Sequence, residues 1–203
     1  MADVPSYAGS AAGETPSTVG RLLEGLARGD PAALDALVAV LYDELRIVAH
    51  RQRRRWRGDD TLGTTALLHE TYLKLRRQKR IGTESRDHFL ALASRAMRHI
   101  LSTCAEQRRT LKRGSAVGRV PVTGVELPAA ESPTADEVLI TMNDALRRME
   151  AVHPRQCRVV ECRFYGGLSV EEAAAALALS PRTIKRDWAF AQAWLKRELG
   201  ELV

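Results

Sequence analysis

At 203 residues, 45% of them hydrophobic, the chain has enough apolar material for one or two compact domains, and an aromatic content of only 5% favours helices packed through Leu, Ala and Val. The net charge of +6 lies in residues 1–135, because residues 136–203 contain equal numbers of basic and acidic residues, and it predicts a polyanionic partner such as nucleic acid or anionic lipid. Three cysteines without a C-x-x-C pair do not indicate a disulfide framework or a zinc knuckle, and no apolar run approaches the ~20 residues that span a bilayer. We therefore expect a soluble, cytoplasmic protein.

The first part of the chain contains a predicted tail and a predicted helix. Residues 1–16 are rich in Ala, Gly, Ser and Pro without periodic apolar positions, which is typical of a disordered tail. Further along, Asp30 followed by Pro31 has the pattern of a helix N-cap, and apolar residues recur at helical spacing as far as Val48. A run of arginines follows, and the helix is expected to stop at Gly58.

Two more helices are expected before the next break in the pattern. The segment TTALLHETYLKLRRQ has an apolar stripe and a cationic end. A third helix begins near Asp87, turns apolar residues between Phe89 and Leu101 inward, and ends in a basic stretch. Because three helices can form one compact bundle, residues 17–113 are predicted to form a helical domain.

The second part of the chain is predicted to be a separate domain. Residues 114–133 contain three prolines and three glycines and have no helical period, which indicates a linker. Residues 134–203 follow, with one helix capped by Thr134 and another that Pro154 opens. The predicted fold is therefore all-α, with two small helical domains joined by a flexible linker.

Two helices separated by a very short turn are predicted at the end of this second domain. Ser169 with Glu172 has the pattern of a capping box before the first helix, and Ser180 with Pro181 starts the second. So short a turn is typical of the DNA-binding helix-turn-helix, whose second helix enters the major groove, although a plain helical hairpin with a charged end is the alternative. The residues expected to reach DNA are Ser180, Arg182, Thr183, Lys185 and Arg186.

The C-terminal segment carries a family resemblance. HPRQCRVVECRFYGGLSVEEAAAALALSPRTIKRDWAFAQAWLKREL resembles, in register, the C-terminal DNA-binding domain of bacterial extracytoplasmic-function (ECF) sigma factors. Its particular marks are the stretch RFYGGLS and the pair Glu171-Glu172. The resemblance implies that this domain recognises the duplex -35 promoter element through the residues at the start of its last helix.

The first domain resembles the same family in two segments. LLHETYLKLRR is similar to the helix by which sigma factors bind the clamp helices of RNA polymerase, and the residues on it are Leu68, His69, Glu70, Tyr72, Leu73 and Lys74. DHFLALASRAMRHILSTCAEQRRTLKRG resembles the helix that melts and reads the -10 element, where a base is flipped out of the stack. The polar residues that this second resemblance assigns to DNA are Arg95, Arg98, His99, Ser102, Arg108, Arg109, Lys112 and Arg113.

These observations predict a sigma factor that binds core RNA polymerase and directs promoter-specific initiation by recognising -10 and -35 elements. A stand-alone helix-turn-helix regulator is the alternative, but the first domain shows neither a ligand-pocket signature nor the strand and helix alternation of a receiver. Enzymatic activity is not expected, because the sequence contains neither G-x-x-x-x-G-K-S/T nor H-E-x-x-H. Core RNA polymerase and promoter DNA are the expected partners, an anti-sigma factor is a further candidate from the family, and no cofactor, metal or membrane is expected.

Overall fold

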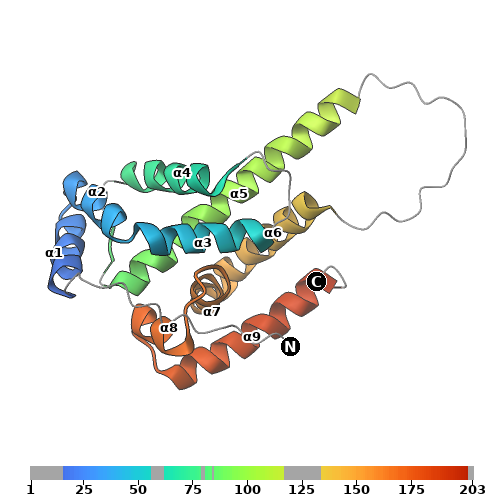
Figure 1. The fold of residues 1–203 in the computed structure, drawn as a ribbon. Coiled ribbons are helices and arrows are strands. Elements are labelled where there is room, and N and C mark those ends of the chain that lie inside the picture. The colour runs from blue at the N-terminus through green and yellow to red at the C-terminus, as the bar shows by residue number, and fades with distance from the viewer. Residues whose placement is uncertain (1–15, 56–61, 79–80, 84, 117–133, 201–203) are drawn as a thin grey trace, which may run out of the picture.

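The computed structural model describes residues 16–55, 62–78, 81–83, 85–116 and 134–200. Within these ranges the chain is all-α and has no strand, which confirms the predicted fold class. The elements, shown in Figure 1, are α1 (Pro16–Ala27), α2 (Pro31–Val40), α3 (Tyr42–Arg55), α4 (Thr64–Arg76), α5 (Arg86–Ala116), α6 (Ala135–Val152), α7 (Pro154–Val160), the π-helical turn η1 (Glu161–Tyr165), α8 (Val170–Leu177) and α9 (Pro181–Leu199). Except for Pro16, the predicted tail lies outside the described residues, and so does the predicted linker beyond Ala116.

The helix predicted from Pro31 onward is present but bends. The Asp30 side chain caps α2 by accepting the N–H of Ala32 at 2.9 Å, as the sequence predicted. The chain then leaves helical geometry at Leu41, and α3 begins at the next residue. The hydrogen bond from the Leu41 N–H to the Leu37 carbonyl, at 3.0 Å, is kept across the bend, so the apolar spacing continues while the axis changes direction.

Helix α1 was not predicted from the sequence. It packs against α2 through the buried side chains of Leu23 and Leu26. A Cβ placed on Gly25 would lie only 2.8 Å from the Cβ of Ala33, so the two helices approach closely because Gly25 has no side chain.

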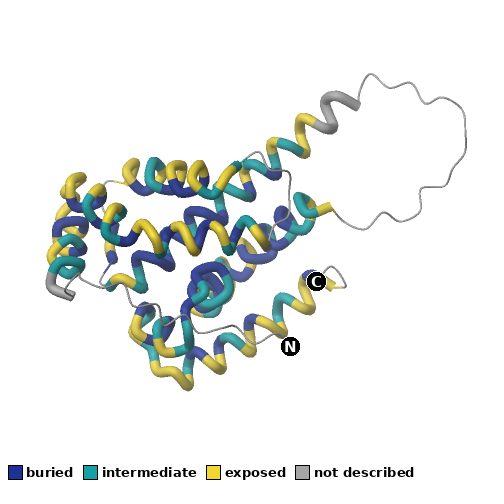
Figure 2. The backbone as a smooth tube through the Cα atoms, in the orientation of Figure 1, coloured by how far each residue is buried: buried dark blue, intermediate teal, exposed yellow. Residues whose placement is uncertain are grey.

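The helices α1 to α5 form the N-terminal half, residues 16–116, around one apolar core. Leu37, Leu67, Phe89 and Met97 are fully buried in it and come from α2, α4 and α5. Figure 2 shows exposed positions on the outer sides of α1 and α4 and buried positions along α5. The apolar stripes read from the sequence therefore face a common interior.

The helices α6 to α9 and η1 form the C-terminal half, residues 134–200, and local signals set their ends. At α6 and at α8, Thr134 and Ser169 each form the reciprocal capping box with the glutamate three residues on. Ser180 caps α9 by accepting the N–H of Thr183 at 3.1 Å. The interior is filled by Leu146 and Met149 of α6 together with residues of α7, η1 and α9.

Helix α5 packs on both halves. One side lies in the N-terminal core, while Ala91 joins a cluster with Val159, and Ala105 joins a cluster with Leu139 and Ile140. Figure 1 shows α6 running beside α5, and the two helices are in contact. The helix continues to Ala116, so the first residues of the segment predicted as a linker are helical.

The three cysteines differ in how far they are buried. Cys157 and Cys162 are buried, Cys104 is half-buried, and all three are free thiols. In the part of the chain that the structure describes, no helix combines the length and the apolar character needed to cross a membrane.

The core of the N-terminal half gives a direct stability test. Replacing the fully buried Leu37 by Ala should lower the free energy of unfolding by about 2–5 kcal/mol, because it removes apolar contacts and leaves a cavity. Leu111→Ala is the matched control, since Leu111 is 73% exposed and its loss should change stability by less than about 0.5 kcal/mol. Urea denaturation of both variants measures the difference, and equal midpoints would contradict the assigned core.

Candidate nucleic-acid interface

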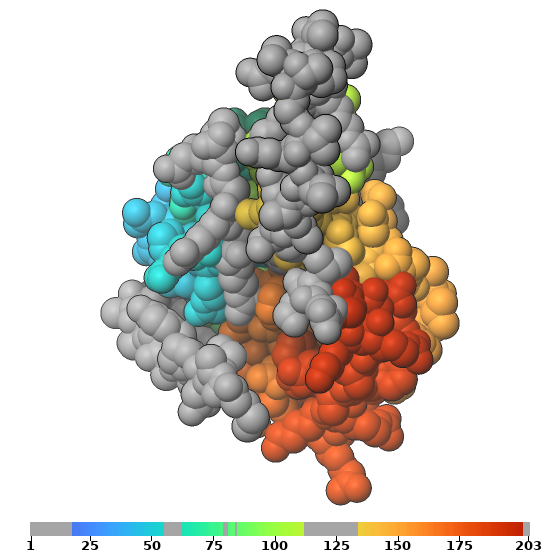
Figure 3. Space-filling view, turned by 90° about the vertical axis from the view of Figure 1, so that its right-hand side faces the viewer, coloured from blue at the N-terminus to red at the C-terminus, as the bar shows by residue number. Residues whose placement is uncertain are grey.

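The start of α9 presents an exposed cationic face. Arg182, Lys185 and Arg186 are all exposed, and the side chain of Arg186 keeps 71% of its surface accessible. Their spacing of three and four residues places them on one side of the helix, while Ile184 lies between them and is fully buried. In the space-filling view of Figure 3, the region around the start of α9 projects from the lower end of the molecule.

The turn before α9 is as short as the sequence predicted. Helix α8 ends at Leu177, and Ala178 adopts a left-handed conformation with φ of 52°. The Leu179 N–H then donates to the Ala174 carbonyl at 2.9 Å, which satisfies a carbonyl at the end of α8. Ser180 follows at once as the cap of α9, so only Ala178, Leu179 and Ser180 separate the two helices.

A buried carboxylate fixes the start of α9 against α7. Asp187 is 2% exposed and accepts hydrogen bonds from Arg155 Nε at 2.6 Å, from Arg155 Nη2 at 3.0 Å and from Gln156 Nε2 at 3.1 Å. Burial by itself raises the pKa of this carboxyl, but the hydrogen bonds from Arg155 and Gln156 outweigh it and hold the pKa below its ordinary value. The ionised Asp187 therefore orients the helix whose first turn is exposed.

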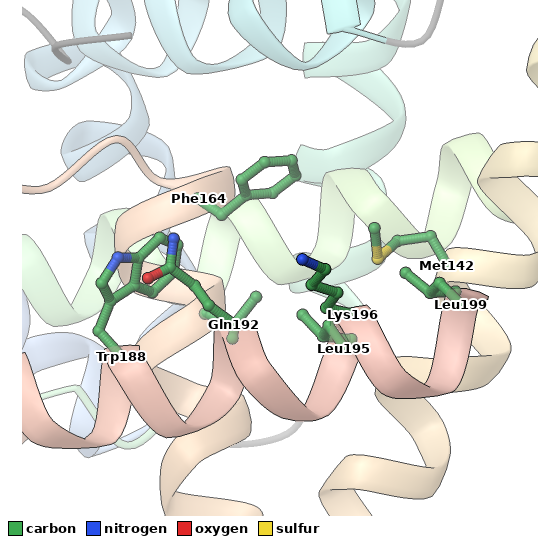
Figure 4. A pocket seen from close by; sticks show the side chains of 8 residues that line it. Met142, Phe164, Trp188, Gln192, Leu195, Lys196 and Leu199 are labelled. Carbon is green, nitrogen blue, oxygen red and sulfur yellow. The ribbon is translucent and has the colours of Figure 1, made fainter. Parts of the chain in front are cut away.

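An apolar groove of about 470 Å³ runs along the later turns of α9. Figure 4 shows Trp188, Gln192, Leu195, Lys196 and Leu199 on α9, with Phe164 and Met142 across from them. The guanidinium of Arg163 lies 5.2 Å from the ring centroid of Trp188, which holds the indole at one end of the groove.

The residues predicted to contact polymerase lie on α4 with different exposures. His69, Glu70 and Lys74 are exposed, and Tyr72 and Leu73 are half-buried. The remaining one, Leu68, is only 8% exposed and belongs to the core of the N-terminal half. The five side chains other than Leu68 are thus at least partly accessible on α4, and Leu68 packs beneath them in the core.

The Tyr72 hydroxyl connects this surface to α2. It donates to Asp35 Oδ1 at 2.8 Å, and the guanidinium of Arg76 lies 5.8 Å from the Tyr72 ring centroid. These contacts fix the aromatic side chain on the outer face of α4.

The residues predicted to contact the -10 element are spread along α5 and are mostly covered. Arg98 and Ser102 are 1% and 2% exposed, and Arg95, His99 and Arg108 are partly buried. Among the others, Arg109 is exposed, and the side chains of Lys112 and Arg113 lie outside the described residues.

The covering groups are acidic or polar residues of the C-terminal half. Arg98 donates from Nη1 to Asn143 Oδ1 at 2.6 Å and from Nη2 to Glu161 Oε1 at 2.8 Å. The remaining pairs are Arg95 with Glu150, Arg95 with Glu161 at 3.4 Å, and Arg108 with both carboxylate oxygens of Asp136. Sequence reasoning did not find these partners, because a buried ion pair between distant helices has no local pattern.

Burial in the contact between α5 and the C-terminal half shifts the pKa values of two side chains, Glu161 and His99. Burial raises the pKa of Glu161, while Arg98 and Arg95 act in the opposite direction. Burial and the neighbouring cations, among them Arg98 and Lys74, lower the pKa of His99 to about 4. In this structure His99 is therefore neutral at pH 7 and offers no positive charge to a phosphate.

Comparison with known proteins places the chain in a family. A family model described as ECF sigma factor matches residues 16–201, so the chain belongs to the ECF sigma factor family. Members of this family are transcription factors rather than enzymes, and membership supports a sigma factor role in transcription initiation, with RNA polymerase and promoter DNA as partners. No curated protein and no solved structure matches the chain.

The hydrogen bonds that Asp187 accepts from Arg155 and Gln156, here called the Asp187 clamp, predict a specific pH dependence. Because the folded state holds the pKa of this carboxyl below its unfolded value, its stabilising contribution is present above the unfolded pKa of about 4 and is lost as the pH falls through the folded pKa. Asp187→Asn should lower the free energy of unfolding at pH 7 by about 1–2 kcal/mol, and the deficit should shrink as the pH is lowered toward 3.

Urea denaturation at a series of pH values measures this deficit. Asp43→Asn, at an exposed position of α3, is the control and should change stability little at any pH. A deficit for Asp187→Asn that stays constant from pH 7 to pH 3 would rule out the charged clamp.

Proposed function

We propose that this ECF sigma factor recognises the duplex -35 element with the start of α9, binds the clamp helices of core RNA polymerase with α4, and recognises the -10 element with α5. The observation that carries the proposal is the exposed cationic face of the first two turns of α9, a helix capped by Ser180 and oriented by Asp187. The family match to residues 16–201 spans all three of these helices.

The chemistry of the first turn of α9 suits the major groove of duplex DNA. Arginine and lysine side chains donate to the O6 and N7 acceptors of guanine, and Arg182, Lys185 and Arg186 have their charged ends in solvent. Thr183 suits a thymine methyl group or a phosphate oxygen, and the N-terminus of a helix attracts phosphate.

The outer surface of α4 is proposed as the contact with core polymerase. His69, Glu70 and Lys74 are exposed there, and the Tyr72 hydroxyl donates a hydrogen bond to Asp35 of α2. The support for this assignment is the resemblance of LLHETYLKLRR to the clamp-binding helix of sigma factors.

The proposed role of α5 rests on its basic polar side. Arg95, Arg98, Arg108 and Arg109 suit the phosphates of a melted strand, and base flipping needs such contacts to offset the cost of unstacking. In the described structure Arg109 is exposed, whereas Arg95, Arg98 and Arg108 pair with residues of the C-terminal half.

Recognition of the -35 element predicts a selective effect of one substitution. Arg186→Ala should weaken promoter-specific binding by about 1–3 kcal/mol, roughly 5-fold to 150-fold, because it removes a donor to a base edge or a phosphate. Arg197→Ala removes the same charge from an exposed position in the last turn of α9 and should have a much smaller effect. Footprinting and titration of a mapped promoter measure both, and association with core polymerase should be unchanged.

Core polymerase binding separates the sigma factor from the regulator alternative. The purified chain should associate with core RNA polymerase and direct it to specific start sites in a transcription assay. Lys74→Glu on α4 should weaken that association by at least about tenfold, since it reverses the charge of an exposed side chain in the proposed contact. Arg46→Glu makes the same reversal at an exposed position of α3 and serves as the control. A chain that binds promoter DNA but never associates with core polymerase would establish the regulator instead.

A further inference from the structure

We propose that Arg155 of α7 binds a backbone phosphate of the duplex beside the -35 element and so holds that duplex against α9. The inference rests on the proposed function of α9 and adds to it a phosphate-binding residue on a different helix. The sequence pattern did not assign Arg155 to DNA, because this residue lies far from the helix-turn-helix along the chain.

The Asp187 clamp leaves one end of the Arg155 guanidinium unused. Nε donates to Asp187 Oδ2 at 2.6 Å, and Nη2 donates to Asp187 Oδ1 at 3.0 Å. Because a guanidinium is a rigid planar fork, binding a carboxylate along this edge directs Nη1 away from that carboxylate. Among the described residues Nη1 has no hydrogen-bond partner, and the Arg155 side chain keeps 44% of its surface accessible.

The clamp also prepares the guanidinium for a second anion. A long side chain that is ordered only on binding loses rotamer entropy, whereas Arg155 is already held by Asp187. Asp187 itself is only 2% exposed, so an approaching phosphate meets the guanidinium and not the carboxylate behind it. A phosphate can therefore bind the free end of Arg155 while the clamp stays intact.

Arg155 lies beside the face of α9 that is proposed to enter the major groove. The Asp187 oxygen that accepts from Arg155 Nη2 also lies 3.9 Å from Arg186 Nε, so Arg155 and Arg186 flank the same atom. Thr183 is four residues before Asp187 and lies on the same side of α9. A cation at the flank of a groove-binding helix suits the phosphate backbone that borders the groove.

A phosphate contact on α7 has a different consequence from a base contact on α9. Phosphate contacts fix the position of a protein on the duplex but carry no sequence information. Loss of Arg155 should therefore weaken binding to every sequence by the same factor. Loss of a residue that reads a base edge should instead reduce the preference for the correct sequence.

The test uses the full chain bound to core RNA polymerase and short fluorescein-labelled duplexes that end before the -10 element. One duplex contains the -35 region of a promoter with a mapped start site, and the other has this region scrambled. The variant is Arg155→Ala. The control is Arg158→Ala, because Arg158 is an exposed arginine of the same helix that lines a small cavity with Ala91 and Leu92 of α5.

Affinity for each duplex is measured at several salt concentrations. Arg155→Ala should weaken binding to both duplexes about tenfold and reduce the slope of log K against log salt by about 0.9, which corresponds to one phosphate. The ratio of the two affinities should not change, and Arg158→Ala should match the unsubstituted chain. If Arg155→Ala keeps the original affinity and slope, or if Arg158→Ala shows the same losses, the inference is wrong.

A second comparison separates a direct contact from an effect through Asp187. Arg155→Ala also removes the main partner of a buried carboxylate, whereas in Asp187→Asn this ion pair is absent with or without Arg155. If Arg155 binds phosphate, adding Arg155→Ala to Asp187→Asn should again reduce the salt slope by about 0.9. No further change in slope would mean that Arg155 acts only through the clamp. This comparison also decides the question if Arg155→Ala alone does not fold.

Neutral methylphosphonates, placed singly in the matched duplex, locate the phosphate. One position should weaken binding of the unsubstituted chain about tenfold and should not weaken Arg155→Ala further. The absence of such a position would overturn the inference while leaving α9 as the reader of the -35 element. If the unsubstituted chain binds the matched and scrambled duplexes equally, α9 does not recognise the -35 element, and the inference falls with the proposed function.

Discussion

The buried guanidinium of Arg98 is the interaction on which the arrangement of the two halves depends. A charge at 1% exposure persists only when it is paired, and Arg98 obtains its partners, Glu161 and Asn143, from across the contact rather than from its own half. Because η1 carries Glu161 and α6 carries Asn143, one side chain of α5 sets the positions of two elements of the C-terminal half. Its guanidinium carbon also lies 5.6 Å from the ring centroid of Tyr165, which adds a third constraint from the same half.

Helix α5 has this influence because it is long and has two packed sides. Phe89 and Met97 face the core of the N-terminal half, whereas Ala91 and Ala105 face the C-terminal half through small side chains. Alanine allows close approach of neighbouring helices but buries little area, so the side that meets the C-terminal half relies more on polar pairs than the side that meets α3 and α4. The helix is thus packed on both halves, through a larger apolar core on one side and through alanines and ion pairs on the other.

The sequence predicted what depends on neighbouring residues and missed what depends on distant ones. The caps at Asp30, Thr134, Ser169 and Ser180 act over two or three residues, and the structure shows all four. The bend at Leu41 was missed because the apolar spacing is the same on both sides of it. The clamp of Asp187 and the covering of Arg98 were also missed, since each joins residues that lie more than 30 positions apart. The exposed face of α9 followed from local pattern, while the accessibility of α5 depended on packing.

The difference in exposure between α9 and α5 suggests an order of events on the promoter. On the proposed function, duplex DNA can meet the first turn of α9 at once, whereas a melted strand must compete with Asp136, Glu150 and Glu161 for the same arginines. Contacts between arginine and phosphate carry no sequence information, because the phosphate backbone is the same at every base. In this structure Asp136, Glu150 and Glu161 already pair with these arginines, so a phosphate that bound here would have to displace a carboxylate.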